Sequence, residues 1–153
     1  MEIERKFLLS RLPDLTPEAR AVVHQGYLSL EPEIRVRRYV PEEGEPVYTL
    51  TVKGEGTLSR EEIETEISEE FFRKAERLIG KPLIRKDYSR YRFEGHILEC
   101  SLVDGSFLYG EVEFGTEEEA LPYVWPFEGT VEITYEKDYK MKNYWRRTRG
   151  EEA

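Results

Sequence analysis

Alternation of charged and apolar residues is the dominant pattern along this chain, and it predicts a protein built mainly from β-strands. Near the start, Glu2, Glu4 and Lys6 occupy every second position, with Ile3 and Phe7 between and beyond them. Because successive side chains of a strand point to opposite faces, such a segment has one charged face and one apolar face. The same alternation predicts strands at 25–30, 34–40, 47–53, 58–67, 83–94, 96–103, 107–114 and in the TVEITY segment after Gly129.

Helical spacing replaces the alternation in a few segments. Residues 68–79 carry an apolar stripe, begin at Ser68, which is a good N-cap, and stop before Gly80. A short helix is expected at 16–22 and a last helix at 138–147. The pattern therefore predicts seven or eight strands with two or three helices. No linker, repeat or low-complexity tract interrupts it, so the chain is expected to form a single domain.

The charged faces of the predicted strands carry rows of charged residues, and in three or more strands the row contains a stripe of like charge. These rows are Glu2, Glu4 and Lys6; Arg35 and Arg37; Arg60, Glu62, Glu64 and Glu66; Lys86, Tyr88, Arg90 and Arg92; and Glu111 and Glu113. In an ordinary β-sandwich these faces would meet water and the apolar faces would form the core. Like charges on neighbouring strands repel unless something of opposite sign is bound between them. A closed barrel with its charged faces inside is therefore a second interpretation, and the pattern alone leaves both open.

The barrel interpretation has a chemical consequence. Barrels of about eight strands can hold one small ligand in their interior. Cations that face each other across such an interior require a polyanion, and carboxylates beside them require a metal ion, because unpaired buried charge is too costly to keep. A polyphosphate bound with Mg²⁺ or Mn²⁺ satisfies both sets, since these ions prefer oxygen ligands.

The composition sharpens this picture. Charged residues make up 36% of the chain, against a usual share of about 25%, while 12% aromatic residues argue against disorder. The net charge of −9 argues against nucleic-acid binding and against docking on an anionic membrane. Cys100 is the only cysteine, which excludes an internal disulfide and a cysteine-based zinc site. With no signal-peptide-like or membrane-spanning apolar run, a cytoplasmic protein is expected.

A set of short motifs resembles a known family. The chain carries Glu-x-Glu-x-Lys at its start, Arg-x-Arg in the predicted strand 34–40 and alternating glutamates after Arg60. In order these motifs are Glu2-x-Glu4-x-Lys6, Gln25-Gly26-Tyr27-Leu28, Arg35-x-Arg37, Thr51-Val52-Lys53-Gly54, Arg60-x-Glu62-x-Glu64-x-Glu66, Lys86 with Arg90-Tyr91, and Glu111-x-Glu113. Their order resembles the CYTH domain of the triphosphate tunnel metalloenzymes over roughly residues 1–115. Each motif alone is common, but the ordered set is specific.

The resemblance implies a mainly β (α+β) fold: an eight-stranded antiparallel closed β-barrel, or tunnel, with a few flanking helices and a single CYTH-like domain over residues 1–153. It implies phosphate binding by Lys6, Arg35, Arg37, Lys53, Arg60, Lys86, Arg90 and Arg92. Metal binding falls to Glu2, Glu4, Glu62, Glu64, Glu111 and Glu113. Catalysis is assigned to Glu2, Glu4 and Glu64, as candidates to orient or deprotonate water, together with Lys6.

Two departures from the family pattern leave alternatives open. The family often has an Asp in the strand before the final Glu pair, and here Glu99 or Ser101 would have to replace it. The segment from Lys86 onward is longer than the usual Lys-x-Arg spacing, so Arg90 and Arg92 are competing choices for one position.

The resemblance favours a metal-dependent triphosphatase that releases a terminal phosphate, with inorganic tripolyphosphate as the leading substrate. Thiamine triphosphate and nucleoside triphosphates remain alternatives, as does a non-catalytic triphosphate- or polyphosphate-binding protein. CYTH-type adenylate cyclases usually carry a His-Phe pair ahead of the first motif, and here Met1 directly precedes Glu2, which favours hydrolysis over cyclisation. The expected cofactor is Mg²⁺ or Mn²⁺, and the expected partner is a small-molecule triphosphate bound by a monomer or homodimer.

Overall fold

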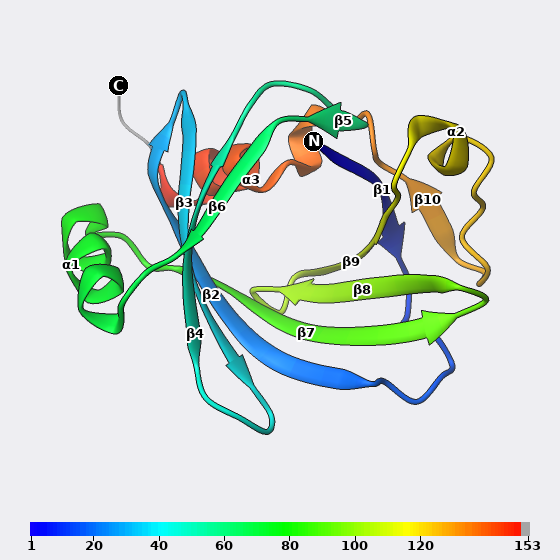
Figure 1. Cartoon of the computed structure of the whole chain (residues 1–153), viewed down its shortest axis with the longest axis horizontal. Helices are drawn as coiled ribbons and strands as arrows, with labels where there is room; N and C mark the ends of the chain where they lie inside the picture. The colour runs from blue at the N-terminus through cyan, green and yellow to red at the C-terminus, as the bar shows by residue number, and fades with distance from the viewer. Residues whose placement is uncertain (151–153) are drawn as a thin grey trace.

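The computed structural model describes residues 1–150 and consists of one strongly curved antiparallel sheet with helices on its outside (Figure 1). The strands are β1 (Glu2–Leu9), β2 (Ala19–Leu30), β3 (Glu33–Pro41), β4 (Val47–Lys53), β5 (Ser59–Arg60), β6 (Glu62–Glu66), β7 (Ile84–Phe93), β8 (His96–Val103), β9 (Phe107–Glu113) and β10 (Thr130–Glu132). The helices are α1 (Glu69–Ile79), α2 (Glu117–Ala120), the 3₁₀ helix η1 (Lys137–Tyr139) and α3 (Met141–Arg149).

The strands form a ring. Hydrogen-bonded neighbours follow the order β10-β1-β9-β8-β7-β2-β3-β4-β6, and β5 pairs with β1. Only Glu61 separates β5 from β6, so the pairing of Glu2 with Arg60 closes the sheet on itself. With β5 and β6 counted as one interrupted strand, the ring has eight strands, and β10 adds to the edge of β1. The predicted eight-stranded antiparallel barrel with flanking helices is confirmed.

The register of the strands turns their charged faces inward. Arg35 on β3 lies beside Thr51 on β4, which lies beside Glu64 on β6. On the other wall, Glu4 of β1 is paired with Glu113 of β9. Directly paired residues point to the same side of a sheet, so the alternation carries the charges of every strand into one interior. The barrel interpretation is therefore the right one, and the sandwich interpretation is wrong.

The apolar faces of the strands point outward and are covered by helices and loops. On one side, Phe72 and Ala75 of α1 pack against Val36 of β3. On the opposite side, α2 and the following loop bring Ala120 and Trp125 onto the outer face of the barrel (Figure 1). The residues of that second cluster are Phe7, Leu9, Tyr91, Leu98, Cys100, Val112, Phe114, Ala120 and Trp125. The hydrophobic cores thus lie between the barrel wall and its cover, which leaves the interior free for polar groups.

The helix predicted at 68–79 is confirmed together with its caps. The Ser68 hydroxyl accepts a hydrogen bond from the backbone N–H of Phe71 at 3.0 Å, and Gly80 ends the helix in the left-handed conformation with φ 65°. Glycine is suited to that position because it has no Cβ to clash. None of the helices within residues 1–150 is both long and apolar enough to cross a membrane.

Three sequence-based boundaries need correction. The helix expected at 16–22 is wrong, because Ala19–Leu30 forms strand β2, where pairing with β3 and β7 buries Ala21 and Val23 and overrides the local helix signals. The strand expected at 58–67 is interrupted at Glu61, whose carbonyl accepts from the Gly54 N–H. The C-terminal helix expected at 138–147 starts at Met141 and is preceded by the separate 3₁₀ helix η1.

Candidate active site

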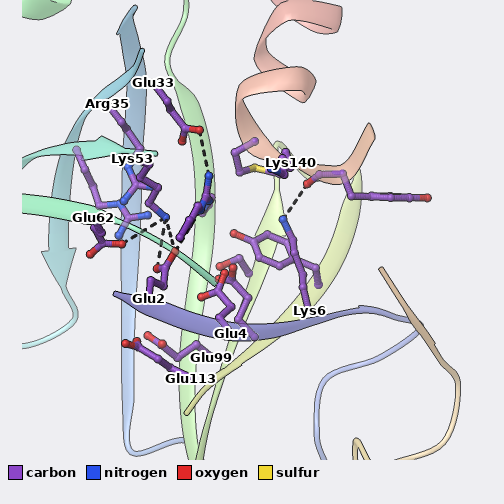
Figure 2. Close-up of a pocket in the computed structure, with 18 of the residues that line it drawn as sticks. Glu2, Glu4, Lys6, Glu33, Arg35, Lys53, Glu62, Glu99, Glu113 and Lys140 are labelled. Atoms are coloured by element: carbon purple, nitrogen blue, oxygen red, sulfur yellow. Dashed lines mark hydrogen bonds and ion pairs between the residues drawn. The ribbon is translucent and has the colours of Figure 1, made fainter. Parts of the chain in front are cut away.

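The barrel encloses a cavity of about 300 Å³ whose walls carry an unusual density of charge. Twelve of the residues predicted to bind substrate or metal line it. The cations are Lys6, Arg35, Arg37, Lys53, Arg60 and Lys86, and the carboxylates are Glu2, Glu4, Glu62, Glu64, Glu111 and Glu113. They come from strands β1, β3, β4, β5, β6, β7 and β9, so only the closed ring brings them together (Figure 2).

Arg90 and Arg92 are the two predicted residues that the structure places outside this cavity. They lie farther along the same face of β7 as Lys86 and line a second, more open hollow beside Glu99. Their Nε atoms lie 3.7 Å and 3.3 Å from the carboxylate of Glu18. Because the barrel interior ends before these positions, neither arginine faces the cavity cations.

Two of the cavity cations are held by carboxylates. The ammonium Nζ of Lys53 lies 3.3 Å from an oxygen of Glu2 and 3.6 Å from one of Glu62. The guanidinium of Arg60 bridges Glu2 at 3.4 Å and Glu33 at 3.2 Å. Figure 2 shows Lys53 between Glu2 and Glu62 at one end of the group. These cations are largely neutralised before any ligand binds.

Three further cavity cations, Lys6, Lys86 and Arg37, contact neutral groups. Lys6 donates to the backbone carbonyl of Tyr139 at 2.8 Å and lies 4.2 Å from the centre of the Tyr109 ring. Lys86 lies 5.3 Å from the centre of the same ring. Arg37 donates to the side-chain amide of Gln25 at 3.1 Å. None of these partners carries a negative charge, so this part of the cavity keeps a surplus of positive charge.

Two of the arginines also have unused hydrogen-bond donors. The Nε atoms of Arg35 and Arg37 are buried and have no hydrogen-bond partner within residues 1–150. A buried donor without a partner costs free energy, which a bound anion would recover. Both arginines belong to the same strand, β3, and both face the cavity. The surplus of charge and the unused donors therefore mark one wall of the barrel as an anion site.

The glutamates of the cavity form hydrogen-bonded carboxyl pairs. Burial raises the pKa of Glu4 well above its usual range, and the neighbouring Glu111 raises it further. Burial also opposes ionisation of Glu111, but the hydrogen bond from Glu4 and the nearby Lys6 and Lys86 outweigh it and lower the Glu111 pKa to about 2. Within this pair the negative charge is therefore favoured on Glu111 over Glu4. Glu2 and Glu62 are likewise hydrogen-bonded to each other.

The six predicted metal-binding glutamates supply hard oxygen donors of the kind that Mg²⁺ and Mn²⁺ prefer. They are spread over β1, β6 and β9. Among residues 1–150, no three His, Cys, Asp or Glu side chains form a group that could hold a metal ion by themselves. The donor chemistry fits a hard divalent ion whose remaining ligands come from water or from a bound phosphate, which is how Mg²⁺ is commonly held.

Several cavity residues escaped the sequence analysis. Glu33 begins strand β3 two residues before Arg35 and is buried beside Arg60, although the sequence places it in a turn. Gln25 and Tyr109 lie on the inward faces of β2 and β9 and hold cavity cations from there. Extending the alternation back by one inward position from Arg35 and from Glu111 would have found Glu33 and Tyr109, whereas Gln25 already opens one of the motifs but had no role assigned to it. One side of the cavity is closed by residues between Ile133 and Met141, a segment that includes η1.

These observations define a class of protein: a closed antiparallel β-barrel whose interior gathers cationic and acidic side chains around one cavity. No protein-family model matches the chain. The chain is 34% identical over 149 residues to the inorganic triphosphatase of Nitrosomonas europaea, and the match covers 92% of this chain and 94% of that protein. The chain therefore belongs to the family of that inorganic triphosphatase.

Solved structures agree with this assignment. The crystal structure of the inorganic triphosphatase NE1496 matches with a TM-score of 0.66 and 26% identity, covering 94% of this chain and 93% of that one. The PH1819 protein from Pyrococcus horikoshii OT3 matches with a TM-score of 0.57 over 80% of this chain and 82% of that one. Its identity of 19% is low, so that likeness shows the shared fold alone.

Proposed function

We propose that this protein is a CYTH-type triphosphate tunnel enzyme that hydrolyses inorganic tripolyphosphate to pyrophosphate and orthophosphate. The observation that carries the proposal is an enclosed group of four cations that form no salt bridge with any carboxylate of residues 1–150: Lys6, Arg35, Arg37 and Lys86. Such a group is costly in an empty protein and becomes favourable when a polyanion is bound. The relationship to the inorganic triphosphatase of Nitrosomonas europaea supports the same substrate.

In this proposal the cavity cations bind and orient the phosphate chain. Arginine presents a planar fork that can contact two phosphate oxygens at once, so Arg35 and Arg37 would grip the terminal phosphoryl group. Lys6 and Lys86 would offset charge that develops on its oxygens in the transition state. Lys53 and Arg60, already paired with carboxylates, would hold the remainder of the chain.

The glutamates would hold a divalent metal ion and activate water. Glu2, Glu4, Glu62, Glu64, Glu111 and Glu113 line the cavity beside the cations and are the proposed metal ligands. When bound, Mg²⁺ or Mn²⁺ would supply Lewis-acid stabilisation of the phosphate oxygens. A water oxygen attacks the terminal phosphorus, the bridging P–O bond breaks, and the water proton passes to a glutamate, for which Glu2, Glu4 and Glu64 are the candidates.

A phosphate-release assay tests the proposal directly. Tripolyphosphate, ATP and thiamine triphosphate are supplied with Mg²⁺, with Mn²⁺ and with a chelator. We expect release from tripolyphosphate that depends on the metal ion. Tight binding of tripolyphosphate without release under any condition would instead identify a receptor, and formation of cyclic AMP from ATP would identify a cyclase.

Two variants test the assigned roles. Glu4→Gln is expected to abolish most turnover while tripolyphosphate still binds, because the cations that grip the anion are untouched. Arg37→Ala is expected to weaken binding by about 10- to 100-fold, the usual size of a lost charge-assisted hydrogen bond. Arg73→Ala, which removes an exposed arginine on α1, is the matched control and should behave as wild type. Unchanged binding in Arg37→Ala would remove Arg37 from the site.

A further inference from the structure

The side chain of Gln25 is buried completely against a cavity arginine. It lies on the inward face of β2, directly opposite Arg37 in the β2–β3 register, and has 0% exposure. Its Oε1 accepts a hydrogen bond from Nη2 of Arg37 at 3.1 Å, and its Nε2 lies 3.5 Å from the hydroxyl of Tyr27. The contact with the Tyr27 hydroxyl therefore orients the amide, and the hydrogen bond from Arg37 to the amide oxygen orients the guanidinium.

A side-chain amide as the partner of a cavity cation is unusual in this chain. The sequence contains 32 acidic residues and a single glutamine, and that glutamine is Gln25. Elsewhere in the cavity, Lys53 and Arg60 are paired with glutamates. A glutamate has nearly the same shape as a glutamine and would form a stronger, charge-assisted bond to Arg37. For the stability of the ligand-free protein, glutamate would be the better residue at this position.

An amide partner and a carboxylate partner differ in how much of the positive charge of Arg37 remains available to a ligand. Both satisfy one donor of Arg37, but the carboxylate also cancels its charge, whereas the amide leaves that charge unpaired. The Nε of Arg37 remains free for a further hydrogen bond. A bound polyanion would therefore meet an arginine that is fixed in position and carries its full charge, as electrostatic preorganisation requires.

We propose that Gln25 is a positioning residue that holds Arg37 toward the terminal phosphoryl group of a triphosphate without neutralising it. This inference rests on the proposed function for the identity of the anion. It makes position 25 a determinant of anion affinity that acts through Arg37. If Gln25 only packed within the barrel wall, its effect on binding would not depend on the charge of Arg37.

Gln25→Glu separates these two roles, because it keeps the shape and adds only a charge. We expect the variant to unfold at the same temperature as wild type or higher, since it gains an ion pair with Arg37. Binding of tripolyphosphate, measured by calorimetry in the presence of a chelator so that no turnover occurs, is expected to weaken by about tenfold or more. Asn143→Asp is the control for net charge. Asn143 lies near the start of α3 and carries the only other side-chain amide of the chain, and this variant should bind tripolyphosphate as wild type does.

A double-mutant cycle provides the second measurement. Gln25→Met, similar in volume but without an acceptor, is expected to weaken binding in the wild-type background and to have little further effect in Arg37→Ala. This cycle also decides the matter if Gln25→Glu fails to fold. Equal effects of Gln25→Met with and without Arg37, or wild-type affinity in a folded Gln25→Glu, would overturn the proposal.

The binding measurement also keeps the two proposals apart. Wild-type protein that binds tripolyphosphate but never hydrolyses it contradicts the proposed enzyme and leaves the role of Gln25 to be decided by the variants. Wild-type protein that does not bind tripolyphosphate, with or without Mg²⁺, overturns both.

Discussion

At the scale of single residues, the partner of each charged side chain decides whether it serves the cavity or the fold. Lys86 lies 5.3 Å from the centre of the Tyr109 ring and forms no salt bridge within residues 1–150, so its ammonium group is left to contact a ligand. Asp104, outside the cavity, is fully used by the fold: it accepts from the Arg85 N–H at 2.9 Å, from the Tyr144 hydroxyl at 2.7 Å and from Arg149 at 2.9 Å. These bonds tie the C-terminal helix to the turn between β8 and β9.

The hydrogen bonds of Asp104 predict a pH-dependent contribution to stability. Burial opposes its ionisation, but the bonds from Arg149, the Arg85 N–H and Tyr144 outweigh it and lower its pKa below the ordinary value of 3.8. A lowered pKa in the folded state means that the contribution is present above pH 3.8 and is lost as the pH falls through the folded-state pKa.

Asp104→Asn is the variant that tests this contribution. Asparagine tolerates the positive φ of 49° at this position, so the turn itself is preserved. We expect a loss of about 1 kcal/mol at neutral pH, after allowing for solvent screening, and a difference from wild type that vanishes in strong acid. Urea unfolding at a series of pH values measures it, with the exposed Asp87→Asn as control. A difference that persists at the lowest pH would contradict the assignment.

At the scale of elements, each strand has an inward face that lines the cavity and an outward face that packs in the hydrophobic core. The inward face of β9 carries Tyr109 and Glu111, and the outward face carries Gly110 and the buried Val112. Trp125, from the loop after α2, packs closely over the outward face at Gly110. Glycine is needed there for space, because a Cβ at this position would lie 2.4 Å from the Trp125 ring.

Gly110→Ala is therefore expected to destabilise the protein by about 1–3 kcal/mol, the usual cost of overpacking a core. The measurement is the urea midpoint together with Trp fluorescence. Gly115→Ala is a matched control, since a Cβ there would approach only the Glu119 carboxylate, at 3.7 Å. Equal midpoints for the two variants would show that Trp125 moves aside without cost.

At the scale of the whole molecule, closure of the barrel collects charges that no single element could hold together. The chain has a net charge of −9, yet its cavity wall at Lys6, Arg35, Arg37 and Lys86 is strongly positive. The overall charge and the local charge therefore have opposite signs. The cost of keeping these cations inside is expected to make the ligand-free protein less stable than its complex with a polyanion.

A ligand that binds only the folded protein raises its stability, by about 2.7 kcal/mol at a concentration of 100 times its Kd. We expect tripolyphosphate to raise the melting temperature in the presence of a chelator, and orthophosphate at equal ionic strength to raise it far less. The effect should be smaller in Arg37→Ala. Equal stabilisation by the two anions would indicate a general salt effect and contradict a cavity built for a longer phosphate chain.

The sequence by itself determined most of the strands, the capped helix at Ser68 and which residues belong to each charged row. These features are local, because strand alternation and helix capping depend on residues within a few positions of one another. The order of the motifs also led to twelve cavity residues and to the triphosphatase hypothesis.

Only the tertiary structure decided which way the charged faces point and where the cavity ends. Closure depends on the pairing of Glu2 with Arg60, residues far apart in the chain, and alternation is the same whichever face is inside. For that reason Arg90 and Arg92 share the pattern of Lys86 but lie outside the cavity. The neutral partners of the cations were also beyond the sequence, because hydrogen bonds across a barrel are set by the register of its strands.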